Sequence, residues 1–230
     1  MAFEIKTDQN TPVEDINTIT NPNTKTLIDR YVFASNFCKD KRVLDCASGW
    51  GYGSQILKAL GANYVMSADI DSDAITYIRQ SVYSNIEFST KTSAKYLDVT
   101  TDWFNDPINS GIEKSFDVVV SIETFEHVPR ETVTQMLTNF KNACSKNGTI
   151  IITTPQRFTP EFKYVEGSTH LYEYTLNEFY EELSKVFTNI KFYYAVEFRH
   201  PASNELNTVF TDNAEWSNRA PVMIAVITND

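Results

Sequence analysis

The chain has 230 residues, of which 42% are hydrophobic and 22% are charged, and its formal net charge is -10. A chain of this length and composition forms one sizeable core rather than two full domains. It contains no apolar run of the roughly 18–20 residues that a bilayer-spanning helix needs, and no apolar segment behind a basic start that would indicate a signal peptide. We therefore expect no membrane insertion.

Charge and cysteine content narrow the function classes further. Proteins that bind nucleic acid carry a basic footprint that neutralises phosphates, and this acidic chain has no Lys/Arg-rich stretch. A small or neutral substrate fits better. Cys38, Cys46 and Cys144 are odd in number and widely spaced, which disfavours both a disulfide framework and a zinc site. This pattern favours a reducing, cytoplasmic location; the sequence leaves the oligomeric state open.

Hydrophobic periodicity predicts helices that alternate with strands after a polar N-terminal arm over residues 1–23. In chain order we expect helix 24–37, strand 42–45, helix 54–60, strand 64–69, helix 74–82, strand 86–88, strand 116–122, helix 130–144, strand 149–153, helix 176–186, and strands 190–196 and 222–227.

This alternation predicts an α/β fold in a single domain over residues 24–230. We expect a Rossmann-like three-layer sandwich with a seven-stranded, mostly parallel sheet. Residues near 155–174 and 198–220 lack clear periodicity and are expected to be loop insertions, which often shape substrate pockets. The aromatic residues of the first insertion either stack on a substrate ring or close the core.

A glycine-rich turn follows the first predicted strand of the domain. Asp45 ends that strand, and Gly49 and Gly51 allow a tight turn that approaches a ligand closely. A carboxylate at this point repels a pyrophosphate but suits a cofactor with an amino group and a sulfonium, and Ser54 breaks the G-x-G-x-x-G spacing of dinucleotide sites. Asp69 ends the next strand, where a carboxylate can accept both ribose hydroxyls. The pattern favours S-adenosylmethionine over NAD.

Three stretches carry a resemblance to a known family. VLDCASGWGYGS, SADID and FDVVVSIETFEHVP resemble the first, second and fourth motifs of class I S-adenosylmethionine-dependent methyltransferases, over roughly Lys25 to Ile227. The chain is most similar to bacterial and phage-type enzymes with RYxFA, ETxEHV and HxxEYT motifs, which are associated with O-methylation of sugars, glycans and quinone precursors. The resemblance implies that the last strand is antiparallel.

The resemblance also implies residue roles. Asp45 and the turn would hold the methionine part, Asp69 the ribose and Ile70 the adenine, while Tyr31 either covers the cofactor or packs in the core. Ser93 and Ala94 stand where the family usually has an acid that contacts the adenine amine, which is a departure. The implied cofactor-binding residues are Tyr31, Asp45, Ala47, Gly49, Trp50, Gly51, Asp69, Ile70, Ser93, Ala94, Ile122 and Glu123.

Carboxylates and histidines cluster after the strand at 116–122. Glu123, Glu126 and His127 are three and four residues apart, which would place them on one side of a helical turn. Such a set can bind a divalent cation, and Mg²⁺ or Mn²⁺ is favoured because two of the three side chains offer oxygen ligands. Together with HLYEYT, the run resembles small-RNA 3′-terminal 2′-O-methyltransferases and ubiquinone-pathway O-methyltransferases. This implies Glu123, Glu126, His127 and His170 as metal ligands.

The carboxylate–histidine cluster has several alternative roles. Without metal, His127 or His170 could serve as a general base beside Glu126; the cluster could also be structural, or Glu123 could cap backbone amides near the cofactor. The leading functional hypothesis is O-methylation of a sugar or glycan hydroxyl by a catalytic set of His127, His170 and Glu126. The others are a catechol or quinone-precursor O-methyltransferase, an RNA 3′-terminal 2′-O-methyltransferase, and a non-catalytic S-adenosylmethionine-binding protein.

Overall fold

The computed structural model describes residues 4–5, 14–15, 21–83, 91–105, 112, 114–164, 166–199 and 206–230. Within the predicted arm, β1 (Glu4–Ile5) and β2 (Glu14–Asp15) pair antiparallel as a separate two-stranded sheet. The first helix, α1 (Pro22–Ser35), begins two residues earlier than expected. Its first residue is a proline, whose missing N–H is harmless at that position because no helical carbonyl would accept it.

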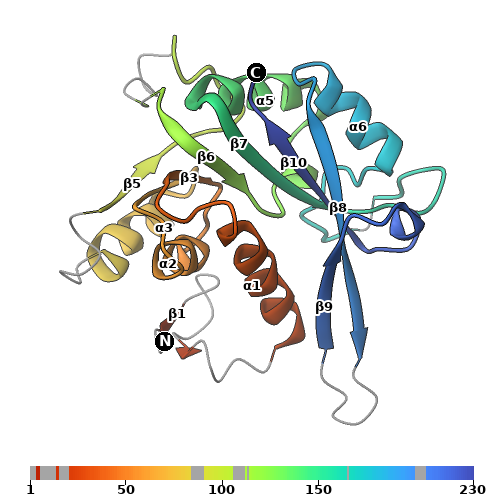
Figure 1. The fold of residues 1–230 in the computed structure, drawn as a ribbon, viewed down its shortest axis with the longest axis horizontal. Helices are drawn as coiled ribbons and strands as arrows, with labels where there is room; N and C mark the ends of the chain where they lie inside the picture. The colour runs from red at the N-terminus through yellow and green to blue at the C-terminus, as the bar shows by residue number, and fades with distance from the viewer. Residues whose placement is uncertain are drawn as a thin grey trace.

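An eight-stranded sheet organises the rest of the described chain, in the order β5-β4-β3-β6-β7-β10-β8-β9 (Figure 1). Strands β3 to β7 pair in parallel, whereas β10 is antiparallel to both β7 and β8, as expected for the last strand. The strands are β3 (Arg42–Cys46), β4 (Tyr64–Asp69), β5 (Thr92–Tyr96), β6 (Phe116–Ser121), β7 (Cys144–Pro155), β8 (Ile190–Arg199), β9 (Leu206–Thr211) and β10 (Val222–Thr228).

The predicted count of seven strands is wrong by one. β8 extends to Arg199 and pairs antiparallel with β9, which lies inside the segment 198–220 that we expected to be a loop. β9 is the edge strand, and none of its described side chains is fully buried, so its sequence carries little hydrophobic signal. The strand expected at 86–88 lies outside the described residues, and β5 occupies the place of the third strand of the parallel half.

Helices cover both faces of the sheet, which confirms the three-layer prediction (Figure 1). Within β6, Val118 and Val120 pack on the side of α1 and α2, whereas Phe116 and Val119 pack on the side of α5 and α6. A strand covered on both faces needs a nearly continuous apolar run. The helices are α2 (Tyr52–Ala59), α3 (Ser72–Tyr77, continued by a π-helical turn over Ile78–Val82), α5 (Val133–Ala143) and α6 (Leu176–Ser184).

Cys38, Cys46 and Cys144 are free thiols, and all three are buried. Among the helices that the structure describes, none has the length and apolarity required to span a bilayer.

A chain of buried hydrogen bonds anchors the glycine-rich turn to its neighbours. Asp45, fully buried at the end of β3, accepts hydrogen bonds from Tyr31 Oη at 3.3 Å and from Ser54 Oγ at 2.6 Å. Ser67 Oγ on β4 donates to Ser54 Oγ at 2.6 Å and shares a 2.5 Å hydrogen bond with Tyr83 Oη. One carboxylate therefore links α1, α2, β3 and β4.

Burial has a thermodynamic consequence for this carboxylate. Desolvation raises the pKa of Asp45 from 3.8 to about 7, although the hydrogen bonds from Ser54 and Tyr31 oppose the shift. A group whose pKa is higher in the folded than in the unfolded chain contributes stability below the unfolded pKa, and this contribution is lost as pH rises through the folded pKa. For Asp45 the loss falls between about pH 4 and pH 7.

We predict that Asp45→Asn flattens the pH dependence of stability. The amide cannot ionise, so the variant should escape a loss of about 1.4 kcal/mol for each pH unit between the two pKa values. Urea unfolding at pH 5 and pH 8 measures this difference. Asp40→Asn makes the same formal change at an exposed position and should keep the wild-type slope. If the free energy of unfolding of wild type and of Asp45→Asn depends equally on pH, the raised pKa of Asp45 is contradicted.

The glycine at position 53, the second residue of α2, makes room for the Tyr31 ring. A Cβ at Gly53 would lie 2.0 Å from Tyr31 Cζ, far inside contact distance. Tyr31 cannot retreat freely, because its hydroxyl is bonded to Asp45 and its ring lies edge-on to Tyr52 at 5.6 Å. The glycine is required here by close approach and not by its backbone angles.

We predict that Gly53→Ala destabilises the fold by about 1–3 kcal/mol, the usual cost of overpacking. Thermal unfolding would show the loss as a lower Tm. Ala59→Ser, a small enlargement in the last turn of the same helix, serves as the control and should change Tm little. An unchanged Tm for Gly53→Ala would mean that the Tyr31 ring can move aside without a loss of stability.

Candidate functional site

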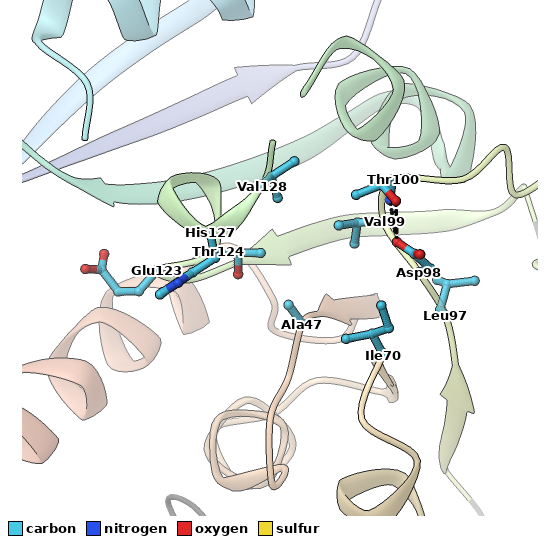
Figure 2. A pocket seen from close by; sticks show the side chains of 10 residues that line it. All are labelled: Ala47, Ile70, Leu97, Asp98, Val99, Thr100, Glu123, Thr124, His127 and Val128. Carbon is cyan, nitrogen blue, oxygen red and sulfur yellow. Dashed lines mark hydrogen bonds between the residues drawn. The ribbon is translucent and has the colours of Figure 1, made fainter. Parts of the chain in front are cut away.

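A cavity of about 310 Å³ opens at the carboxyl edge of the parallel strands (Figure 2). Its walls come from the loops that follow β3, β4, β5 and β6, which is where open α/β sheets bind ligands. The lining residues are Ala47, Ile70, Leu97, Asp98, Val99, Thr100, Glu123, Thr124, His127 and Val128.

The glycine-rich turn forms one side of this region. Ala47, Gly49 and Gly51 all have positive φ angles, of 54°, 52° and 83°. Asp69 holds the turn in place: its Oδ2 accepts a hydrogen bond from the Gly49 amide at 2.7 Å. No atom lies within 4 Å of where a Gly49 Cβ would be, so the backbone there faces open space. Ile70 follows directly, is 57% exposed, and presents an apolar surface to the cavity.

Other residues implied by the resemblance lie behind this surface. Tyr31, Asp45 and Ile122 are buried, and Tyr31 and Ile122 belong to the core cluster on the α1–α2 side. Trp50 lies in the turn, where its ring stands edge-on to Tyr77 at 5.3 Å. Asp45 and Tyr31 therefore support the turn from within, and none of these four residues lines the cavity.

Ser93 and Ala94, which the resemblance implies at the adenine, do not line the cavity. Both lie in the middle of β5, where Ser93 Oγ bonds Tyr64 Oη at 2.6 Å and the Ala94 carbonyl accepts from the Arg79 guanidinium. The cavity is instead lined by the residues after the strand, including Leu97 and Asp98.

A signal for Asp98 was present in the sequence. Asp45 is the penultimate residue of β3, Asp69 is the last residue of β4, and Asp98 comes two residues after β5. The sequence predicts the third strand at 86–88, before β5, and so does not place Asp98 after a strand. Asp98 Oδ1 accepts hydrogen bonds from the backbone amide and the hydroxyl of Thr100, at 2.8 and 2.7 Å (Figure 2). These bonds fix the carboxylate beside the cavity.

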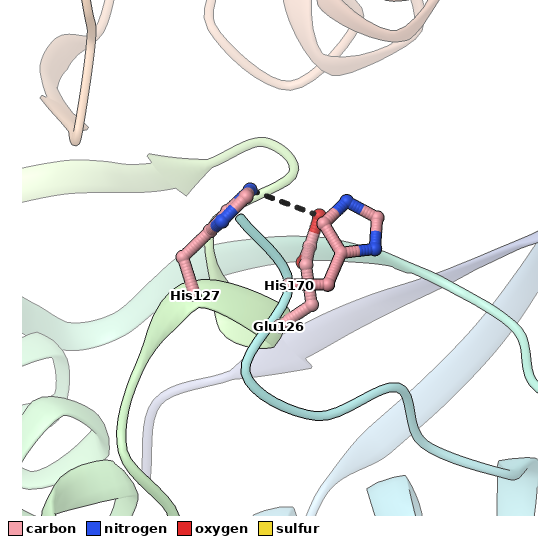
Figure 3. Close-up of side chains that lie close together, drawn as sticks. All are labelled: Glu126, His127 and His170. Atoms are coloured by element: carbon pink, nitrogen blue, oxygen red, sulfur yellow. Dashed lines mark ion pairs between the residues drawn. The ribbon is translucent and has the colours of Figure 1, made fainter. Parts of the chain in front are cut away.

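Beside the cavity, Glu126, His127 and His170 come together so that one ligand-type atom from each lies within 4.8 Å of the others (Figure 3). Glu126 and His127 lie on a 3₁₀ turn over Phe125–His127. His170 comes from the loop after β7, which is held to this turn because the Glu126 carbonyl accepts from the amides of Leu171 and Tyr172, at 2.8 and 3.1 Å.

The hydrogen bonds of the two imidazoles define their tautomers. His127 Nδ1 lies 2.9 Å from the Thr169 carbonyl, and His170 Nδ1 lies 2.7 Å from Glu173 Oε1. A carbonyl or carboxylate oxygen only accepts, so each Nδ1 carries a hydrogen and each neutral ring keeps a lone pair on Nε2. His127 Nε2 lies 3.7 Å from Glu126 Oε1. Partial burial lowers the pKa of His127, which favours the neutral ring.

Glu126 is the most deeply buried member of the cluster, with an exposed fraction of 1%. Its Oε2 accepts a hydrogen bond from Thr154 Oγ1 at 2.9 Å. Desolvation raises its pKa to about 8, and the nearby Glu123 carboxylate adds to the shift. A cation, or a proton shared with a neighbour, would relieve this buried carboxylate.

Glu123 does not join the three converging residues, contrary to expectation. Its φ of 51° turns the chain before the 3₁₀ turn begins, so residues 123–127 do not form one helical turn and the three-residue offset does not bring the side chains together. Glu123 Oε1 accepts from Thr153 Oγ1 at 2.7 Å, and its Oε2 lies 3.8 Å from Arg30 Nη1. Arg30, which sequence reasoning missed, is buried and also bonds Glu197 at 3.1 Å.

Comparison with solved structures supports the fold. A TehB-like SAM-dependent methyltransferase from Corynebacterium glutamicum matches with a TM-score of 0.56 and 18% identity, over 89% of this chain and 88% of that chain. TehB from Haemophilus influenzae matches with 0.60 and 17%, over 88% and 62%. An S-adenosylmethionine-dependent methyltransferase from Mesorhizobium loti matches with 0.58 and 15%, over 87% and 96%.

A search of curated protein sequences finds no match. The sequence model of the family described as "Methyltransferase domain" matches residues 22–201. This match covers most of the chain, including the glycine-rich turn, the cavity-lining loops and the cluster. The chain therefore belongs to the methyltransferase-domain family.

Proposed function

We propose that this protein is an S-adenosylmethionine-dependent O-methyltransferase whose acceptor is a hydroxyl of a sugar or glycan. The observation that carries the proposal is the cluster of Glu126, His127 and His170 at the rim of the cavity. In its neutral form each imidazole carries its hydrogen on Nδ1, so that the lone pair of Nε2 can take a proton from a hydroxyl.

The donor side of the cavity fits S-adenosylmethionine, which supplies the methyl group. Asp98 lines the cavity and can accept from the adenine amine, and Ile70 offers an apolar surface for a planar ring. Asp69 is buried directly before Ile70, where its two oxygens accept from the amides of Gly49 and Asp71, and its remaining lone pairs would accept from the ribose hydroxyls. The open backbone at Gly49 leaves space for the remaining part of the molecule. The acidic surroundings suit a cationic nucleoside better than a pyrophosphate.

On the acceptor side, His127 lines the cavity and is the residue best placed to receive the hydroxyl proton. His170 stands edge-on to it at 5.0 Å between ring centroids. Glu126 would stabilise an imidazolium formed at His127, because its Oε1 faces His127 Nε2. Holding the acceptor oxygen in line with the methyl carbon supplies most of the rate advantage of such a site, on the order of 7–11 kcal/mol.

The same three residues form a reasonable set for a divalent cation. Two imidazole nitrogens and one carboxylate oxygen favour Mn²⁺ over Mg²⁺, since Mg²⁺ prefers oxygen ligands only. Bound there, a cation would lower the pKa of a coordinated hydroxyl. Both histidines also donate Nδ1–H to an oxygen acceptor, the arrangement usual for metal-binding imidazoles. As the alternative to a metal-free base at His127, we therefore propose Glu126, His127 and His170 as the ligands of such a cation, with Glu123 outside the set.

We predict that His127→Ala lowers methyl transfer by about 10²–10⁴-fold, the usual contribution of a general base, while leaving cofactor affinity within a few-fold of wild type. Transfer of a labelled methyl group to a panel of neutral sugars and glycans measures activity, and calorimetry with S-adenosylhomocysteine measures binding. Asp69→Asn is the contrasting variant and should weaken binding itself. If His127→Ala methylates at the wild-type rate, the proposed role of the cluster is wrong.

The metal role has a separate test in Glu173, which positions His170 without belonging to the ligand set. Glu173→Ala should weaken Mn²⁺ binding about 10–100-fold, the usual effect of losing such a supporting hydrogen bond. Electron paramagnetic resonance of free Mn²⁺ measures the affinity. Glu173→Gln keeps an oxygen acceptor for Nδ1–H and should rescue most of it, and Glu166→Ala removes an exposed acid of the same loop as a control. Activity unchanged by a strong chelator would refute metal assistance.

A further inference from the structure

A second cavity, of about 340 Å³, shares no lining residue with the first. It forms where the loop after β7, the beginning of α6 and the turn before β10 meet, elements that lie close together in Figure 1. The lining residues that matter here are Gln156, Arg157, Phe158, Thr175, Asn177 and Asn218. Its volume lies within the range of small-molecule sites.

Its electrostatic character is neutral. Arg157 is the charged residue among the described ones that line it, and four of the five N–H groups of its guanidinium donate to described residues. It forms an ion pair with Glu178 Oε2 at 2.5 Å and donates further hydrogen bonds to the carbonyls of Glu173 and Thr159 and to Tyr172 Oη. Because the charge of Arg157 is balanced by Glu178, a phosphate or carboxylate ligand would meet no unpaired cation among the described lining residues, which disfavours an anionic ligand.

Amide groups supply the free hydrogen-bonding capacity of this cavity. Asn177 and Asn218 are exposed, and neither amide has a partner among the residues that the structure describes. Gln156 donates Nε2–H to the Ser217 carbonyl at 2.7 Å, but its buried Oε1 has no partner within the described chain. Each of these amides offers both a donor and an acceptor.

One apolar ring completes the lining. Phe158 is 55% exposed, although a phenyl ring usually buries most of its surface. Neutral amides arranged around an exposed aromatic ring match the chemistry of a pyranose: neighbouring hydroxyls pair with amides, and the C–H face of the sugar packs on the ring. The combination distinguishes a neutral sugar from both an ion and a purely apolar ligand.

We propose that this second cavity is a subsite for a neutral sugar unit, so that the acceptor is an oligosaccharide with at least two sugar units. The inference rests on the proposed function and narrows its substrate class. The two sites are linked by the segment 170–175: Arg157 Nε bonds the Glu173 carbonyl, and the Tyr172 amide bonds the Glu126 carbonyl. One unit would occupy the second cavity while a hydroxyl of another reaches His127.

The test is saturation-transfer NMR on the full chain loaded with S-adenosylhomocysteine. The probes are neutral di- and trisaccharides of glucose, galactose, mannose and rhamnose, their sulfated counterparts, and a single-stranded RNA oligomer, all at millimolar concentration. We expect at least one neutral probe to bind, and Phe158→Ala and Asn177→Ala to weaken that binding at least tenfold. Tyr180→Ala removes an exposed aromatic ring of α6 outside the cavity and should leave binding unchanged.

The outcomes separate this inference from the proposed function. Binding that survives in His127→Ala but is lost in Phe158→Ala would support a subsite independent of the catalytic cluster. Absence of binding to every neutral probe, binding unaffected by Phe158→Ala and Asn177→Ala, or a preference for sulfated sugars or RNA would each overturn it. If sugar binds in this cavity but no sugar is methylated, the subsite stands and the proposed reaction fails.

Discussion

The buried Asp45 carboxylate is the constraint on which the site depends. It joins the helix α1 to the turn and to β4 through Tyr31, Ser54 and Ser67, all of which are buried. A buried polar group left without partners costs about 1–3 kcal/mol, so Tyr31, Asp45, Ser54 and Ser67 hold one another in place. The turn is thereby presented to the cavity with its backbone exposed, and Asp69 fixes its outer side through the Gly49 amide.

A second constraint assembles the cluster of Glu126, His127 and His170. The carbonyl of Glu126 holds the amides of Leu171 and Tyr172, and this pair of bonds brings His170 beside His127 across 43 residues of sequence. The side chain of Glu126 is buried beneath the same contact, where its pKa is raised to about 8 by desolvation and by the Glu123 carboxylate. The energetic cost of burying a carboxylate here is consistent with a functional role, because active sites concentrate such groups.

Much of the fold could be predicted because its strands are covered on both faces. The run in β6 and the strand–turn–helix at Asp45 carry strong local signals, and both were located within a residue or two. The edge strand β9 was missed because its side chains are only partly buried. Asp98 was missed because the third strand was expected at 86–88, whereas β5 is a half-buried strand whose sequence carries little hydrophobic signal, and the resemblance pointed to Ser93 and Ala94 instead.

The sequence by itself determined the chemistry: which acids end the strands, where the glycines allow the chain to turn, and which residues of the cluster can accept a proton. Only the tertiary structure decided which of them meet. The left-handed backbone at Glu123 directs that carboxylate to Thr153 and Arg30, while Glu126, His127 and His170 converge. Side-chain directions depend on backbone angles and on contacts between distant segments, and neither is encoded in the spacing of residues along the chain.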